Sequence, residues 1–295
     1  MQRIADLLKN DCCIFIGAGI PNAIGLPLWN KLAQDLIDYT WAEKNAFASD
    51  SLTYSVKQEL GDFVQKGKPI TAITYCRDLF RGVNREKDYQ AKIIEFLHSE
   101  VKYSLARTNP VYMQVGKLFK KAIVMQTNLD KSIEEYCKIT AYMNTSLPNG
   151  ASIPYLVYLH GIITDPTSWV MARDEYDNFY QRNQPFLDFI QNVFRGYDVI
   201  FLGYSLSDKE ILDQIAKVKG AGKQYILVLE EIDRNKSANL VWENELKHYD
   251  ITVIRYSVEQ EGYEAFARFL EGINSLMMPP VQIAKQNQDG STIDG

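Results

Sequence analysis

Four short segments of the chain carry the kinds of residues that nucleotide sites use, and each follows an apolar run. They lie at residues 17–21, 127–130, 159–161 and 203–208. Glycine lets a backbone approach a phosphate, an asparagine amide both donates and accepts, and an imidazole can take a proton near neutral pH. Open α/β sheets bind ligands at the carboxyl ends of their strands. If the apolar runs are parallel strands, the four segments therefore form one nucleotide site.

The first segment is a glycine-rich turn. Its small residues would let backbone N–H groups hold a pyrophosphate. The spacing is not the full dinucleotide-binding fingerprint, because position 22 is Asn22 and the next glycine is Gly25. A tight strand-to-helix turn without a ligand is the alternative. The candidate cofactor-binding residues of this loop are Gly17, Ala18, Gly19, Ile20 and Pro21.

The second and third segments supply polar groups for a reaction. Asn128 and Asp130 can hold ribose hydroxyls or a water. An Asn-x-Asp pair is also typical of a capping turn, and Asp130 would then cap a helix that starts at Lys131. His160 has a reference pKa of about 6.5 and can take a proton from a ribose hydroxyl or a water. A purely structural histidine is the alternative.

The hydrophobic pattern predicts the elements that must position these segments. Strands are expected at residues 12–16, 122–126, 139–142, 155–159, 199–202, 225–229 and 252–256. Helices are expected at residues 1–10, 28–39, 51–65, 69–80, 88–103, 110–119, 173–182, 185–195, 208–218, 237–248 and 263–277.

This alternation predicts an α/β fold. We expect a Rossmann-like, doubly wound parallel sheet with a helical insertion after the first strand. Residues 1–280 are expected to form a single domain, with the insertion at about 40–118. The tail 281–295 is polar and patternless, which favours a flexible segment.

Composition excludes several classes of function. The net charge is −5 and no Lys/Arg stripe interleaves with aromatic residues, so direct nucleic-acid binding is not expected. No apolar run approaches the length of about 20 residues that spans a bilayer, and no signal-peptide core is present, so we expect a cytoplasmic protein with no membrane contact. With four cysteines outside Cys-x-x-Cys spacing and three histidines, a metal site is not expected.

The four segments resemble, in order, the signatures of sirtuin-like NAD-binding domains, in particular the bacterial branch of antiphage defence. Gly-Ala-Gly at 17–19 is followed by Gly-Leu-Pro-Leu-Trp at 25–29. Thr-Asn-x-Asp, His-Gly and Gly-Tyr-Ser-x-x-Asp follow later in the chain. The resemblance implies that Asn128 orients water and ribose and that His160 is the catalytic base.

The resemblance also implies further contacts to the dinucleotide. Ser207 or Asp208 would cap the next helix, and Glu230 at the end of a later apolar run would bind the adenosine ribose diol. The other cofactor-binding residues it implies are Thr127, Asp130, Gly203, Tyr204 and Ser205.

The implied activity is NAD+ glycohydrolysis, which cleaves NAD+ to nicotinamide and ADP-ribose as the effector of antiphage (abortive-infection) defence. NAD+ is then a substrate, and no metal takes part. The chain lacks the two Cys-x-x-Cys pairs of the sirtuin zinc module, so a zinc-free deacylase is the less favoured reading. A non-catalytic module that senses NAD+ or ADP-ribose stays open as the main alternative.

A constitutive NADase would kill its host, so the resemblance implies a gated enzyme. We expect a homo-oligomer and a separate activating protein. A hexameric DNA-translocase ATPase is the favoured partner, and an Argonaute-type protein is the other candidate.

Overall fold

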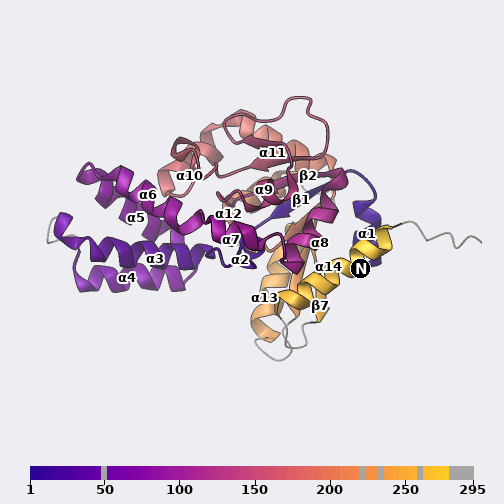
Figure 1. The fold of residues 1–295 in the computed structure, drawn as a ribbon, viewed down its shortest axis with the longest axis horizontal. Coiled ribbons are helices and arrows are strands. Elements are labelled where there is room, and N and C mark those ends of the chain that lie inside the picture. Colours follow the sequence, from indigo (N-terminus) through magenta and orange to yellow (C-terminus); the bar gives the residue numbers. More distant parts are fainter. Residues whose placement is uncertain (48–51, 207, 219–223, 231–235, 258–261, 279–295) are drawn as a thin grey trace, which may run out of the picture.

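The centre of the molecule is a seven-stranded sheet in which every pairing is parallel (Figure 1). The computed structural model describes residues 1–47, 52–206, 208–218, 224–230, 236–257 and 262–278. The strand order is β3-β4-β2-β1-β5-β6-β7. The strands are β1 Cys12–Ile16, β2 Ala122–Gln126, β3 Ala141–Met143, β4 Tyr155–Tyr158, β5 Val199–Leu202, β6 Gln224–Glu230 and β7 Ile251–Ser257. The order reverses at β1, which lies between β2 and β5.

Helices connect the strands, which confirms the predicted α/β class with a helical insertion after the first strand. The predicted tail at 281–295 lies outside the described residues. The α-helices are α1 Gln2–Leu8, α2 Gly19–Asn22, α3 Trp29–Ala42, α4 Tyr54–Gln65, α5 Pro69–Gly82, α6 Glu86–Leu97, α7 Glu100–Leu105, α8 Pro110–Leu118, α9 Ser132–Cys137, α10 Arg173–Arg182, α11 Gln184–Gly196, α12 Lys209–Lys217, α13 Lys236–Lys247 and α14 Tyr263–Met277.

The single helix predicted at 88–103 is wrong, because the chain forms α6 and α7 there instead. Between them His98 has an extended backbone. The Ser99 side chain then accepts a hydrogen bond from the Lys102 N–H and begins the new helix. Serine is a strong N-cap residue, so this local bond is sufficient to restart the helix.

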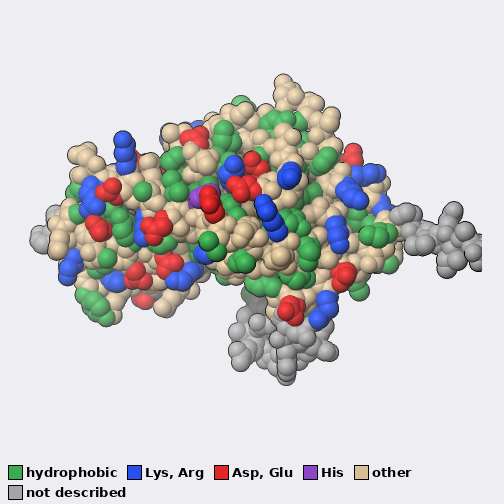
Figure 2. Space-filling model, viewed as in Figure 1, with side chains coloured by type: hydrophobic (Ala, Val, Ile, Leu, Met, Phe, Trp, Pro, Cys, Tyr) green, Lys and Arg blue, Asp and Glu red, His purple; other side chains and the backbone are tan. Residues whose placement is uncertain are grey.

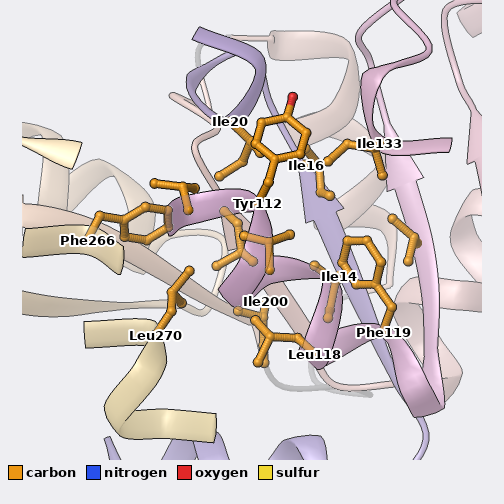
Figure 3. Close-up of a cluster of buried hydrophobic side chains, with 14 of the residues drawn as sticks. Ile14, Ile16, Ile20, Tyr112, Leu118, Phe119, Ile133, Ile200, Phe266 and Leu270 are labelled. Carbon is orange, nitrogen blue, oxygen red and sulfur yellow. The ribbon is translucent and has the colours of Figure 1, made fainter. Parts of the chain in front are cut away.

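The central strands β1, β2, β4 and β5 are buried on both faces, as in a typical parallel sheet. All five residues of β1 are buried, and successive side chains enter opposite cores. Ile14 and Ile16 pack with α1, α8 and α14 (Figure 3). Cys13 and Phe15 pack with α10, α11 and α12 on the other face. This two-sided burial explains why the central strands are continuous apolar runs.

The insertion forms a helical lobe beside the sheet, built from α3, α4, α5 and α6 (Figure 1). Its surface mixes basic and acidic side chains in the view of Figure 2. Its apolar core is shared with loops of the sheet, because Leu129, Trp169 and Met171 belong to the same buried cluster. The lobe is therefore packed directly against the loops that follow β2 and β4.

A buried arginine ties the lobe to α10. Arg77 of α5 is 3% exposed, and its guanidinium contacts three carboxylates. Its Nη1 lies 2.8 Å from Glu175 Oε1. The other oxygen of Glu175 accepts hydrogen bonds from the backbone N–H groups of Met171 and Ala172. This network fixes the first turn of α10 against the lobe.

The loops after β1 and β5 touch through their backbones. Gly17 N–H donates to the Leu202 carbonyl at 3.0 Å, and Gly19 N–H donates to the Gly203 carbonyl at 2.9 Å. A Cβ atom on Gly17 would lie 2.5 Å from the Gly203 oxygen, and one on Gly19 would lie 2.9 Å from it. Gly203 itself has φ +62°, a conformation that favours glycine. Only glycine permits this approach.

We predict that Gly17→Ala lowers the free energy of unfolding by about 1–3 kcal/mol, because the added methyl group clashes with backbone atoms that cannot rotate away. Urea denaturation measures the change. Gly196→Ala is the matched control, since nothing lies within 4 Å of a Cβ there. Its stability should stay unchanged or rise by up to about 1 kcal/mol. Equal stability of the two variants would contradict the close contact.

We predict that Arg77→Ala costs about 2–4 kcal/mol of unfolding free energy, because it removes a buried side chain together with its charge-assisted hydrogen bonds to partly exposed carboxylates. Arg81→Ala serves as the control. Arg81 is 40% exposed and pairs with Glu86. It contacts the Arg77 network only at 3.6 Å from Asp174 and 3.9 Å from Glu175, so its loss should cost no more than about 1 kcal/mol. Chemical denaturation of both variants would show a similar small loss if the Arg77 network did not support the fold.

Candidate active site

A cavity of about 470 Å³ lies at the carboxyl ends of β1, β2, β4 and β5. This volume falls within the range of small-molecule sites. The four central strands thus bring the predicted segments together. The predicted residues that line it are Ala18, Gly19, Pro21, Thr127, Asn128, Asp130, His160, Gly203, Tyr204 and Ser205.

Asn128 follows β2 and offers the cavity a free hydrogen-bond donor. Its Nδ2 atom is buried and has no protein partner among the described residues. The next residue is held in place, because the Leu129 carbonyl accepts a hydrogen bond from Ile163 N–H. A buried amide without a partner is costly, so a ligand that accepts from Nδ2 would be stabilised.

The carboxylate of Asp130 forms most of its hydrogen bonds within the protein. It accepts from the N–H and the hydroxyl of Ser132, the first residue of α9. The capping interpretation is therefore correct in kind, but the helix starts one residue later than Lys131. Burial raises the pKa of Asp130 to about 6. Its predicted role in binding ribose is limited by these internal bonds.

His160 follows β4 and is 4% exposed. Two tyrosines of α10 surround its ring: Nε2 lies 2.7 Å from the Tyr180 hydroxyl, and Nδ1 lies 3.5 Å from that of Tyr176. Burial lowers the pKa of His160 to about 3, so the free-histidine value of 6.5 does not apply here. The imidazole is therefore neutral at physiological pH, and the nitrogen that carries its lone pair faces a tyrosine hydroxyl.

The backbone of His160 is fixed by the loop that follows it. Val170 N–H donates to the His160 carbonyl at 2.9 Å. Gly161 has φ +87°, and a Cβ there would lie 2.2 Å from the Ser168 carbonyl oxygen. The buried Asn144 side chain donates to that same Ser168 oxygen at 2.9 Å. The packing of this loop therefore requires the glycine of the His-Gly pair, whatever the chemistry of His160.

The glycine loop differs from the sequence-based expectation. The N–H groups of Gly17 and Gly19 bond to the β5 strand and its loop, and Ile20 N–H bonds to the Gly17 carbonyl at 3.2 Å. Gly17 and Ile20 also do not line the cavity. We expected the amides of this loop to hold a pyrophosphate, and for the N–H groups of Gly17, Gly19 and Ile20 this expectation is wrong. Ala18 N–H has no bonded partner among the described residues and is the amide left to donate.

The loop after β5 lines the cavity with Gly203, Tyr204 and Ser205, as expected. The Tyr204 hydroxyl is buried without a partner in the described part of the chain. Glu230 ends β6 and pairs with Ser257 of β7, and its side chain lies outside what the structure describes. Ser207 is also outside the described residues.

Sequence reasoning missed several residues of the cavity wall. Trp29 and Tyr176 line it, and so does Asp208, which had been interpreted as a helix cap. Asp208 precedes α12, but its side chain makes no capping hydrogen bond. The Gly-Leu-Pro-Leu-Trp segment was the available signal for Trp29. The insertion adds apolar wall residues that no local pattern marks: Leu32, Pro69, Ile70 and Leu97.

This chain is similar to a known domain family and to a known NAD(+) hydrolase. Residues 122–254 match the family described as SIR2-like domain, a region that includes Asn128, His160 and Asp208. The NAD(+) hydrolase ThsA of Bacillus cereus (strain MSX-D12) is 19% identical over 222 residues, which are 73% of this chain and 41% of ThsA. The chain thus spans less than half the length of that relative.

Two features are absent from the part of the chain that the structure describes. The described residues contain no group of three or more His, Cys, Asp or Glu side chains arranged to hold a metal ion. Within the same ranges, no helix combines the length and hydropathy needed to cross a bilayer. The fold and the cavity are consistent with the family match, so residues 122–254 are similar to a SIR2-like domain.

Proposed function

We propose that this protein is an NAD+ glycohydrolase that converts NAD+ to nicotinamide and ADP-ribose. The observation that carries the proposal is the shared cavity of Asn128 and His160, one with an unpartnered donor and the other a neutral imidazole. The similarity to an NAD(+) hydrolase supports it. NAD+ is the substrate in this reaction.

The proposed chemistry is replacement of nicotinamide by water at the ribose C1′ atom. The C1′–N bond breaks, its electron pair stays with the ring nitrogen, and nicotinamide leaves as a neutral molecule. The water oxygen bonds to C1′ and releases a proton. Asn128 would orient the ribose and the water, and His160 would accept the proton from the water or a ribose hydroxyl. These contacts must strengthen as positive charge develops on the ribose.

The cavity wall suits a substrate with one apolar end. Trp29, Leu97 and Met171 supply flat and apolar surface, and the insertion contributes much of it. Such a wall would displace water from the apolar part of a bound substrate, which would strengthen the polar contacts nearby. The insertion thus forms part of the binding site.

We further propose that the enzyme is an effector of antiphage (abortive-infection) defence. Uncontrolled cleavage of NAD+ would deplete the host, so activity requires a trigger. Assembly of this chain into a homo-oligomer, together with a separate activating protein, would supply it. A hexameric DNA-translocase ATPase is the favoured partner and an Argonaute-type protein the alternative.

We predict that Asn128→Ala and His160→Ala each lower the rate of nicotinamide release by about 100-fold or more. Chromatography of the released nicotinamide measures the rate. His248→Ala is the control, since His248 is exposed and lies outside the cavity wall. Thermal unfolding should show that the variants stay folded. Full activity of either cavity variant would contradict its assigned role.

We predict that nicotinamide release per protomer rises with protein concentration, because assembly gates the site. Light scattering on the same samples reports the oligomeric state. A constant rate per protomer across a change in assembly would rule out this gating. Silence at every concentration, with NAD+ binding seen by calorimetry, would favour a partner-dependent enzyme or the sensor-module alternative.

A further inference from the structure

Asp208 contributes a buried carboxyl group to the cavity, and the mechanism proposed above gives this group no role. Asp208 has a side chain that is 12% exposed, and its Oδ2 lies 3.7 Å from His160 Nε2. Its Oδ1 atom is buried and has no hydrogen-bond partner among the described residues. Its side chain makes no full capping hydrogen bond to α12, although the N–H groups of Glu210 and Ile211 lie near enough to favour its charged form. The Oδ1 atom is therefore the part of this carboxyl group that the fold leaves unused.

Among the residues that the structure describes, no Lys or Arg forms an ion pair with Asp208. His160 is neutral, and the tyrosines that face the carboxyl group, Tyr176, Tyr180 and Tyr204, have pKa values raised by burial and stay neutral as well. Glu210 is a second acid beside Asp208: its side chain hydrogen-bonds to the Asp208 carboxyl group and also contacts Arg173 at 3.3 Å. Burial first, and then Glu210, raises the pKa of Asp208 to about 8.

The cavity as a whole is also short of positive charge. Among the described residues that line it there is no Lys or Arg, whereas Asp130 and Asp208 both reach it. Asp130 is bonded to Ser132, so Asp208 is the acid with an open oxygen. A buried carboxyl group without a cation is protonated until an opposite charge comes within about 4–6 Å. The site is therefore complementary to a ligand group that carries a positive charge.

NAD+ has such a group, because its nicotinamide ring is cationic until the glycosidic bond breaks. We propose that Asp208 is a third catalytic residue: its carboxylate faces the nicotinamide ribosyl group and stabilises the positive charge as that charge moves from the ring nitrogen to the ribose. The carboxyl proton passes to solvent when the cation enters. The inference rests on the proposed NAD+ glycohydrolase function and assigns specificity for the oxidised dinucleotide to one side chain.

The charge of the ring supplies the test, since NADH has the same shape with a neutral ring. NADH binding is followed by its fluorescence in a stopped-flow instrument, and NAD+ is measured as a competitor before product accumulates. We expect the wild-type protein to prefer NAD+ by on the order of tenfold or more. Asp208→Asn should lose that preference and keep its affinity for NADH, which also shows that the variant is folded.

The pH dependence provides a second readout. Below about pH 8 the carboxyl proton must be removed before the cation can pair, so wild-type affinity for NAD+ should rise as the pH approaches 8. Affinity for NADH should not follow it, and Asp208→Asn should show no such rise. Nicotinamide release by Asp208→Asn should fall by about 100-fold or more. Asp213→Asn, at a side chain that is 48% exposed on the same helix, should behave as the wild type.

The outcomes separate this inference from the function on which it rests. An Asp208→Asn variant that keeps the wild-type preference for NAD+ would overturn the role of Asp208 and leave dinucleotide binding intact. A wild-type protein that binds NAD+ and NADH with equal affinity would also overturn the role of Asp208, while showing that the site binds dinucleotides. If the wild type binds neither dinucleotide, the proposed function is itself wrong, and the inference falls with it.

Discussion

The site depends on a backbone contact between the loops that follow β1 and β5. These strands are neighbours at the centre of the sheet, and their loops meet where Gly19 N–H donates to the Gly203 carbonyl. A side chain at Gly17 or Gly19 would force the loops apart. The contact closes one side of the cavity and uses amides that a ligand would otherwise take. The glycines therefore shape the site more than they bind its ligand.

The opposite side of the cavity depends on packing between the insertion and the sheet. Leu129 and Trp169, from the loops after β2 and β4, are buried in the same cluster as the helices of the lobe. Arg77 adds a buried ionic connection to the start of α10, the helix that carries Tyr176 and Tyr180. A change in the lobe would therefore reach His160 through α10. This gives the insertion a physical route by which assembly could alter the site.

Burial has opposite effects on the two titratable groups at the centre. Low dielectric surroundings disfavour a charge on either of them, so His160 loses its proton and Asp208 keeps its own. Near neutral pH neither of these two groups therefore carries a charge before a ligand enters. Electrostatic stabilisation is strongest where water is excluded, so a cationic substrate meets a carboxyl group that can respond strongly to it. The same burial that positions the groups thus sets their chemistry.

The sequence alone was enough to predict where the strands lie along the chain and to select Asn128 and His160, which follow two of them, as cavity residues. It could do so because apolar runs report burial locally and because parallel strands place their following loops at one edge. Tertiary structure decided which groups remain available. The Gly19 N–H donates to the Gly203 carbonyl and is not available to a ligand. The Asp208 carboxyl group lies beside His160 instead of capping α12, and the lobe places Leu97 in the cavity wall. Hydrogen-bond partners and desolvation come from segments far apart in the chain, and local periodicity carries no information about them.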